Sequence, residues 1–268
     1  MKHSDYLVPL GKKVRLADHD ADDTGEFKNR EQADKLLEKH RERLFELQEL
    51  MYAEDKHALL VILQAMDAGG KDGAIRHIFT GVNPQGCQVT SFKEPTPLES
   101  QHDFLWREHF AVPPRRMIGV FNRSYYESVL IVRVHGEISD ANAEKRFDAI
   151  NNFEKLLVEN HTSVLKFFLH ISKDEQRDRL QARLDHPKKY WKVSDTDLRE
   201  RKFWDEYVTA YEDVFTRCNT NQAPWYIIPA NKKWFRNAVI SQILVDTLEG
   251  LKMKYPKAEF DRKKMKLT

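Results

Sequence analysis

The chain has few of the features that mark secreted or membrane proteins. It contains only two cysteines, Cys87 and Cys218, which form neither a disulfide framework nor a metal-ligand spacing. The longest apolar run, residues 58–65, is too short to cross a bilayer, and Met1 to Asp5 lack the apolar segment of a secretory signal. We therefore expect a cytoplasmic protein with no membrane partner.

The motifs of zinc and acyl-transfer chemistry are also missing. No H-x-x-x-H pair favours zinc, and neither a G-x-S-x-G motif nor a Cys–His arrangement favours acyl transfer. With 44 Lys and Arg against 42 Asp and Glu, the net charge is +2, so no global field favours nucleic acid as a partner. At 41% hydrophobic and 32% charged residues, the 268-residue chain has an ordinary globular composition and can bury a full core.

A βα rhythm runs through most of the chain. The expected strands are 58–65, 87–92, 116–121, 164–171 and 225–230, with helical segments between them. This alternation predicts an α/β fold with a parallel sheet of about five strands and helices on both faces.

Upstream of the first strand, an irregular arm is expected over 1–28 and a long helix over 29–52. The leucine face of that helix could pack on its own domain or on a second subunit. We therefore divide the chain into an N-terminal arm and helix, 1–56, and a main domain, 57–268.

The most informative segment joins the first expected strand to the helix after it. Its sequence is QAMDAGGKDG, residues 64–73. A buried strand, a glycine-rich turn and a helix N-terminus together build a phosphate cradle from backbone N–H groups. Gly69, Gly70 and Gly73 let the backbone approach an anion, and Lys71 adds a positive charge where the helix dipole is already positive. The segment predicts a phosphate site.

The match to the G-x-x-x-x-G-K-[ST] pattern is imperfect, because Ala65 replaces the first glycine and Asp72 replaces the Ser or Thr. The alternative is an ordinary strand-to-helix turn in which the glycines serve packing and Lys71 is solvated. Asp67 favours the phosphate interpretation. A carboxylate at an anion site repels the ligand unless a divalent cation lies between them, and Asp67 could anchor Mg²⁺ there.

Polar side chains follow the other expected strands as well. Lys93 follows the second and Asn122 and Arg123 follow the third, whereas His170 lies at the end of the fourth. Because ligands bind at the carboxyl ends of parallel strands, we expect these ends to converge. Arg123 could clamp a phosphate or form a salt bridge at a helix start, and Glu127 could be a dipole partner in the first turn of that helix.

Basic residues gather between 177 and 202, and Pro187 interrupts the helical pattern there. They are Arg177, Arg179, Arg183, Lys188, Lys189, Lys192, Arg199, Arg201 and Lys202. A basic hairpin over a phosphate site would be a lid, whereas a solvated helical face is the alternative. The aromatic residues of the helix expected over 197–218 favour a core role over base stacking.

Taken together, these motifs resemble the family-2 polyphosphate kinases, a branch of the P-loop kinases similar in fold to thymidylate kinase. The resemblance covers the chain from about residue 30 onward. It rests on QAMDAGGKDG (64–73), FNRSYYE (121–127), the stretch 185–194, WDEY (204–207) and APWY (223–226). It implies a three-layer αβα P-loop kinase fold with a helical lid at about 177–202.

The resemblance also implies a function, which is reversible, Mg²⁺-dependent phosphoryl transfer between inorganic polyphosphate and AMP or ADP, giving ADP or ATP. The implied catalytic residues are Asp67, Lys71, Arg123, Arg179 and Arg183, with Asp67 also the metal ligand. The implied substrate-binding residues are Ala68, Gly69, Gly70, Asp72, Gly73, Lys93, Asn122, Glu127, Arg133 and Lys189. The combination of Asn122 and Glu127 resembles the subgroup that accepts both nucleoside monophosphates and diphosphates.

Relatives are commonly oligomers, so the resemblance implies a homo-oligomer. Two other functions stay open at this point. One is an ATP-dependent nucleoside monophosphate kinase, and the other is a non-catalytic module that binds polyphosphate or nucleotide.

Overall fold

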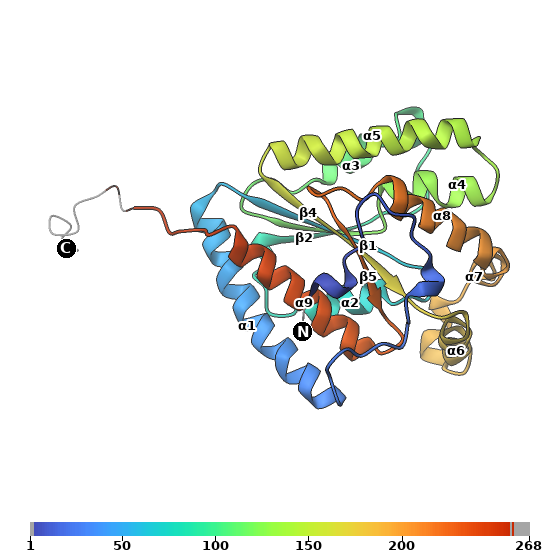
Figure 1. The fold of residues 1–268 in the computed structure, drawn as a ribbon, viewed down its shortest axis with the longest axis horizontal. Helices are drawn as coiled ribbons and strands as arrows, with labels where there is room; N and C mark the ends of the chain where they lie inside the picture. The colour runs from blue at the N-terminus through green and yellow to red at the C-terminus, as the bar shows by residue number, and fades with distance from the viewer. Residues whose placement is uncertain (1–2, 258, 260–268) are drawn as a thin grey trace.

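A parallel sheet forms the centre of the molecule (Figure 1). The computed structural model describes residues 3–257 and 259. Over these residues the sheet has five strands in the order β2-β3-β1-β4-β5. The strands are β1 (Ala58–Gln64), β2 (Cys87–Ser91), β3 (Ile118–Asn122), β4 (Thr162–His170) and β5 (Trp225–Pro229). All neighbouring pairs are parallel, which confirms the predicted α/β sheet.

Helices cover both faces of the sheet, with α1, α2 and α9 on one side and α3, α5 and α8 on the other (Figure 1). The helices are α1 (Arg30–Glu54), α2 (Lys71–Ile78), α3 (Trp106–Ala111), α4 (Ile131–Val134), α5 (Asp140–Glu159), α6 (Lys173–Leu184), α7 (Asp195–Glu200), α8 (Trp204–Arg217) and α9 (Lys233–Gly250). This is the three-layer architecture of P-loop kinases. None of the helices described is long and apolar enough to span a membrane.

The position of β1 in the sheet explains its composition. It lies between β3 and β4, with helices over both faces, and every one of its residues is buried. A strand covered on both sides favours a continuous apolar run over an alternating one. The edge strand β2 is only partly buried, and most of its side chains are polar. The sequence of β1 therefore places the turn that follows it at the middle of the sheet's carboxyl edge.

The leucine face of α1 packs on its own domain. Asn29 caps the first turn of the helix by accepting from the amide of Gln32, and the buried side chains include Leu37, Leu44 and Met51. They pack along α9 and share one core with the strands. This contact settles the alternative left open by the sequence.

The N-terminal arm is more regular than expected. It contains two short 3-10 helices, His3–Tyr6 and Leu16–Asp18. Between them, the amide of Val8 donates to the carbonyl of Trp225, so the arm lies along β5. The division of the chain near residue 56 stays a prediction.

Two helices expected from the sequence are interrupted in the structure. The first was expected to run from Ser124 past Arg133, but residues 125–129 form a 3-10 helix and α4 begins only after Leu130. The hydroxyls of Tyr125 and Tyr126 both donate to Oε1 of the buried Glu154. Glu154 lies on α5, so contacts with a distant helix hold the first residues of this segment, and such tertiary contacts outweigh helical spacing.

The second interruption divides the helix expected over 197–218 into α7 and α8, joined by a 3-10 helix at Arg201–Phe203. The basic hairpin has the expected two helices, α6 and α7, and a 3-10 helix, Pro187–Lys192, joins them.

Candidate active site

The turn between β1 and α2 has the backbone geometry of an anion-binding site. Ala68 and Gly70 have positive φ angles of 59° and 95°, on either side of Gly69. Backbone in which left-handed residues alternate with ordinary ones turns successive amides toward one point. The first amides of α2, from Lys71 onward, also lack intrahelical partners because they begin the helix. The turn can therefore donate several N–H groups to a phosphate.

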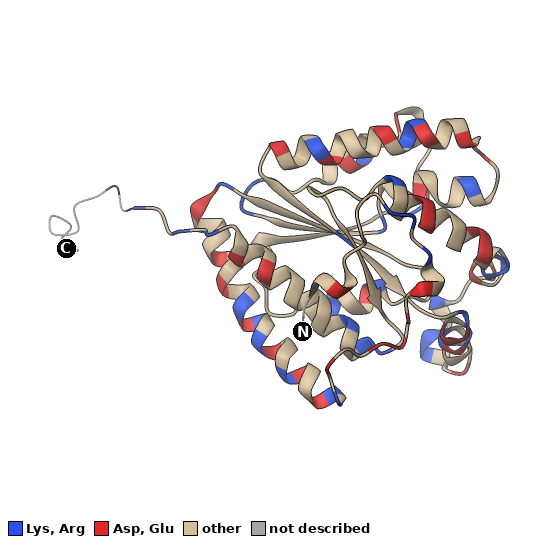
Figure 2. Cartoon of the chain, in the orientation of Figure 1, with Lys and Arg blue, Asp and Glu red and all other residues tan. Residues whose placement is uncertain are grey.

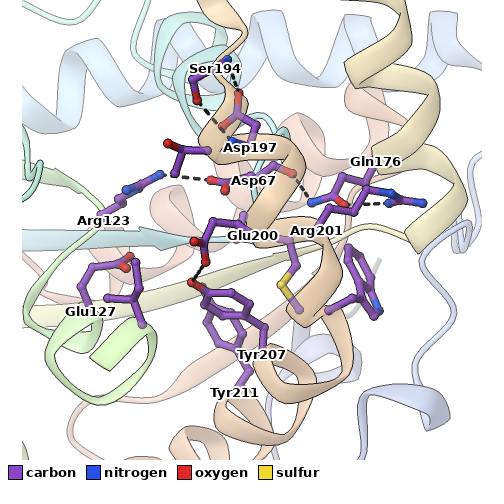
Figure 3. A pocket seen from close by; sticks show the side chains of 15 residues that line it. Asp67, Arg123, Glu127, Gln176, Ser194, Asp197, Glu200, Arg201, Tyr207 and Tyr211 are labelled. Carbon is purple, nitrogen blue, oxygen red and sulfur yellow. Dashed lines mark hydrogen bonds and ion pairs between the residues drawn. The ribbon is translucent and has the colours of Figure 1, made fainter. Parts of the chain in front are cut away.

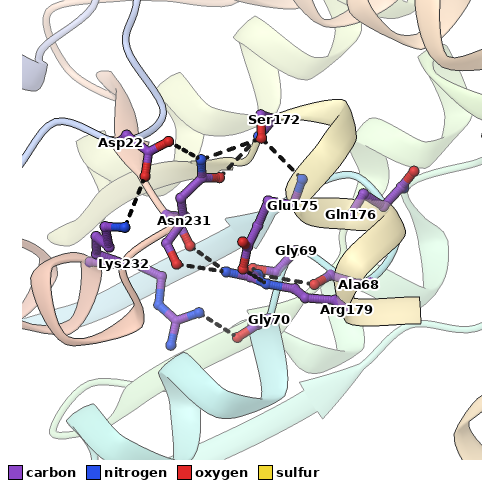
Figure 4. Close-up of polar contacts among 12 residues, drawn as sticks. Asp22, Ala68, Gly69, Gly70, Ser172, Glu175, Gln176, Arg179, Asn231 and Lys232 are labelled. Atoms are coloured by element: carbon purple, nitrogen blue, oxygen red, sulfur yellow. Dashed lines mark hydrogen bonds and ion pairs between the residues drawn. The ribbon is translucent and has the colours of Figure 1, made fainter. Parts of the chain in front are cut away.

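The carbonyl groups of the same turn are held by arginines. Nη1 of Arg179 donates to the carbonyls of Ala68 and Gly69, at 3.1 and 3.0 Å (Figure 4). Nη1 of Arg236 donates to the carbonyl of Gly70 at 3.1 Å. The backbone of the turn is thereby fixed from the side away from its amides.

Lys71 is directed back into the turn. Its Nζ donates to the carbonyl of Ala65 at 3.2 Å. Burial, with the nearby charge of Arg123, lowers the pKa of Lys71 to about 8. These observations disagree with the alternative in which Lys71 is an ordinary solvated side chain.

Asp67 and Arg123 meet where the β1 and β3 ends adjoin. Nη2 of Arg123 lies 3.1 Å from Oδ1 of Asp67, and the backbone amide of Arg123 donates to the carbonyl of Leu63. Beside this pair, Nδ2 of Asn122 donates to Oδ1 of Asp72 at 2.7 Å. The predicted convergence of the first and third strand ends is thus present.

A pocket of about 230 Å³ opens beside Asp67 and Arg123 (Figure 3). Its walls come from the β1 turn, the segment after β3, and helices α6, α7 and α8. The lining residues are Ala65, Met66, Asp67, Arg123, Glu127, Ile131, Gln176, Ser194, Thr196, Asp197, Glu200, Arg201, Trp204, Tyr207 and Tyr211. Figure 3 shows Asp67 and Asp197 near one another, and below them Glu200 hydrogen-bonded to Tyr207. Charged groups of both signs therefore surround a cavity with one aromatic wall.

The hairpin closes one side of this pocket through specific contacts. Ser194 and Asp197 cap α7 reciprocally, and both residues line the pocket. Burial and the Asp67 charge raise the pKa of the Asp197 carboxyl. Nη1 of Arg201 donates to Oε1 of Gln176 at 2.7 Å and ties the hairpin to α6. The position fits a lid.

Several residues expected at the site lie apart from the pocket. Lys93 is exposed beyond β2, and Lys189 is exposed on the hairpin. Nη2 of Arg133 lies 2.9 Å from Asp213 on α8. Arg183 does not line the pocket itself. It donates to the carbonyl of Lys192 within the hairpin, and its Nη1 lies 3.7 Å from Oδ2 of the pocket residue Asp197. Their roles toward substrate stay predictions.

Arg179 is also engaged. Besides the turn carbonyls, its guanidinium pairs with Glu175 at 2.7 Å and donates to the carbonyls of Ala230 and Asn231. It is 9% exposed in this arrangement. The structure thus places it against the turn backbone, and its predicted action from the lid stays a prediction.

Sequence reasoning missed four residues that the structure brings to the site. Gln176 donates to the carbonyl of Asp67 at 2.9 Å, and Asp197 and Glu200 line the pocket. The sequence around these three residues is that of an ordinary charged helix, so nothing in it indicates a site residue. Arg236 had one, because it is a single charge among the buried residues of α9 and lies in the first turn of that helix.

The residues present fit a magnesium ion held jointly with substrate. Asp67 is the one carboxylate at the turn that faces the pocket beside Arg123, and no three potential ligand side chains gather anywhere in residues 3–257 and 259. Mg²⁺ usually takes one or two carboxylates and completes its shell with waters and phosphate oxygens. Asp67 would therefore hold the ion against a bound phosphate.

The fold and the site define a phosphotransferase of the P-loop class, since they combine a phosphate-binding turn, a lysine, a pocket carboxylate and a lid. The family model described as Polyphosphate kinase 2 (PPK2) matches residues 27–256, and the chain belongs to this family. It is an enzyme that transfers phosphoryl groups.

Relatives resemble the chain over almost its whole length. It is 51% identical over 255 residues to the AMP/ADP-polyphosphate phosphotransferase of Meiothermus ruber, covering 95% of this chain and 96% of that protein. It is 47% identical over 276 residues to the ADP-polyphosphate phosphotransferase of Rhodopseudomonas palustris, covering 98% and 96%. A crystal structure of polyphosphate kinase 2 from Arthrobacter aurescens TC1 matches with a TM-score of 0.91 at 47% identity, covering 95% of this chain and 92% of that chain.

Proposed function

We propose that the protein transfers phosphoryl groups reversibly between inorganic polyphosphate and AMP or ADP, with Mg²⁺. The observation that carries the proposal is the pairing of an anion-binding turn, residues 67–73, with a separate pocket reached through Asp67 and Arg123. Two phosphate-bearing substrates must meet for such a reaction, and this arrangement provides adjoining places for them. The names of the Meiothermus and Rhodopseudomonas relatives support these substrates.

Each residue at the turn has a distinct task in this reaction. The amides of the turn bind phosphate oxygens, and protonated Lys71 balances charge on the transferred group. Arg123 holds the acceptor phosphate in line with the donor. Bound Mg²⁺ would supply further positive charge, and Asp67 would orient it. Phosphoryl transfer depends mainly on such positioning and electrostatic stabilisation, so no covalent intermediate is required.

Acceptance of both AMP and ADP is the finer part of the proposal. Asn122 donates to Asp72 and brings no negative charge of its own to the acceptor site. Glu127 lines the same pocket as Arg123. A neutral residue at 122 reduces repulsion of an acceptor phosphate. The printed name of the Meiothermus relative includes both nucleotides, whereas that of the Rhodopseudomonas relative includes ADP alone.

The test uses the full chain with polyphosphate, Mg²⁺ and either AMP or ADP. We expect AMP to yield ADP and then ATP, and ADP to yield ATP, when nucleotides are separated by chromatography. A parallel reaction with ATP and AMP but no polyphosphate measures the competing monophosphate kinase activity. Failure to phosphorylate either acceptor from polyphosphate would contradict the proposal, and turnover only with ATP would establish the alternative.

The assembly and the location of the enzyme complete the proposal. We propose that it forms a homo-oligomer. Phe45 and Tyr52 on α1 are each 45% exposed, which offers apolar surface to a second copy. Light scattering coupled to size exclusion would show a mass above that of one chain, and a monomer would contradict this part. Both cysteines are free, which suits work in the reducing cytoplasm.

A further inference from the structure

Two arginines that lie far apart in the sequence meet at the carbonyl side of the phosphate turn. Arg179 comes from α6 and Arg236 from α9, and together they donate to three consecutive carbonyls, those of Ala68, Gly69 and Gly70. The Gly70 carbonyl also accepts the amide of Ala74 in the first turn of α2. The backbone orientation of the whole turn is thus fixed through its oxygens.

The environment of Arg236 is unusual for a cation. Its side chain is 1% exposed, and among residues 3–257 and 259 it makes no salt bridge. Its other hydrogen bonds go to Oδ1 of Asn237, a neutral group. Burial, together with the charge of Arg179, lowers the pKa of Arg236 to about 9. A buried charge with no acidic partner is costly, so a role besides packing is required to explain it.

The fit between the arginine and the turn is close. A methyl group at Gly70 would lie 2.5 Å from Nη1 of Arg236, and one at Gly73 would lie 3.7 Å from its Nη2. Gly70 therefore leaves the room that the guanidinium occupies, and the two residues form one unit. The planar guanidinium can serve backbone on one side and Asn237 on the other at the same time.

We propose that Arg236 is a positioning residue for phosphoryl transfer, which holds the Gly70 carbonyl toward α9, next to the two carbonyls held by Arg179, so that the amides of the 68–70 turn face the phosphate. The inference rests on the proposed function, since it assigns to Arg236 the support of the backbone that binds phosphate at the same site. Arg236 does not touch the substrate in this account. It acts through the turn, and its positive charge behind the amides adds to their attraction for a polyanion.

The variant that tests this is Arg236→Met, which keeps the length of the side chain and removes its charge and fork. We expect kcat to fall by about 10²-fold, because an error of about 1 Å in the position of reacting groups has that effect. The KM for AMP should change little, since the acceptor pocket is built from other elements. Arg236→Lys, which restores the charge and one donor, should recover part of the loss.

The control is Arg43→Met, which removes an exposed arginine on α1. Arg43 pairs with Glu249, which lies on α9 as Arg236 does. Circular dichroism and thermal melting identify any variant that fails to fold. If Arg236→Met does not fold, the kcat and KM of Arg236→Lys test the inference. Unchanged kcat and KM in folded Arg236 variants would overturn the inference.

A second readout keeps the inference separate from the proposed function. Tripolyphosphate should raise the melting temperature of the unmodified protein and raise that of Arg236→Met by less. This measurement does not depend on which nucleotide the enzyme uses. An equal shift in both proteins would overturn the inference even if transfer to AMP were never detected. A normal shift in the unmodified protein without any transfer would instead count against the proposed function alone.

Discussion

At the scale of single residues, the ionisation of Lys71 controls the charge of the phosphate site. The pKa of Lys71 is lowered to about 8 by burial and by Arg123, so the ammonium form predominates below that pH and is lost progressively above it. We expect kcat/KM to fall about tenfold per pH unit above about pH 8, since this parameter reports the free enzyme. Bound phosphate favours the charged lysine, so the fall in kcat should occur at higher pH.

The measurement is a pH–rate profile of the wild type beside Lys71→Arg. A guanidinium stays charged throughout this range, so the alkaline fall should disappear from the variant even if its overall rate is lower. If both proteins lost activity at the same pH, another group would be responsible and Lys71 would not be the titrating residue.

Asp67 allows a second prediction at this scale. We expect Asp67→Asn to lower kcat by about 10²- to 10³-fold, because a group that orients charge in the transition state has effects of that size. The Kd for AMP, measured by calorimetry, should change far less. Asp174→Asn removes an exposed carboxylate on α6 and is the matched control. Retention of full activity in Asp67→Asn would remove this residue from the metal site.

The residues that sequence reasoning placed well are those whose role depends on local order in the chain. Asp67, Lys71 and Arg123 follow strand ends, and the parallel sheet brings those ends together. The orientation of Arg133 and Arg179 depends on partners 80 and 51 residues away, Asp213 and Ala230. No spacing rule reaches that far, so their contacts could not be predicted.

At the scale of secondary-structure elements, a buried ionic network supports the segment after β3. Lys166 on β4 is fully buried, and its Nζ donates to Oε2 of Glu154 at 2.6 Å. It also donates to the hydroxyl of Tyr126 and to the carbonyl of Cys218. The network joins α5, β4 and the end of α8 to the 3-10 helix that carries Glu127. It therefore connects the core to one wall of the pocket.

Removing one member of this pair should be strongly destabilising. For Lys166→Met we expect the free energy of unfolding to fall by about 3–5 kcal/mol, because the Glu154 carboxylate is left buried without a cation. Urea denaturation measures the change. The double variant Lys166→Met with Glu154→Leu should recover much of the loss, since no uncompensated charge then remains. A single variant as stable as the wild type would contradict this account.

The same network shows which elements a sequence pattern can predict. The five strands were predicted closely, because long apolar runs between polar turns leave few alternatives. The helix expected after Ser124 was wrong, because its residues have helical spacing but two adjacent tyrosines share one distant carboxylate. Tertiary contacts outweigh local preference in such cases.

At the scale of the whole molecule, charge is spread evenly while function is confined to one edge of the sheet. Figure 2 shows acidic and basic residues interleaved over the outer helices. The hairpin between α6 and α7 is tied at its α7 end, where Glu200 accepts from Tyr207 and pairs with His135. Its connecting segment is more exposed, and Trp191 within it is 78% exposed. The base of the lid is thus fixed and its tip is open to solvent.

This division leads to a prediction for the tip of the lid. Replacing Pro187–Lys192 by six Gly and Ser residues keeps its length and removes its rigidity, its cations and its aromatic rings. We expect kcat for transfer to AMP to fall about tenfold, with a rise in the share of phosphate released to water, because a lid excludes water from the reacting groups. The two products are measured together as ADP and free phosphate.

Lys189→Gln is the comparison variant, since it removes one charge and keeps the segment rigid. If that single change lowered transfer equally without added hydrolysis, attraction of the polyanion would account for the lid's effect. An unchanged ratio of transfer to hydrolysis in the six-residue replacement would contradict water exclusion by this segment.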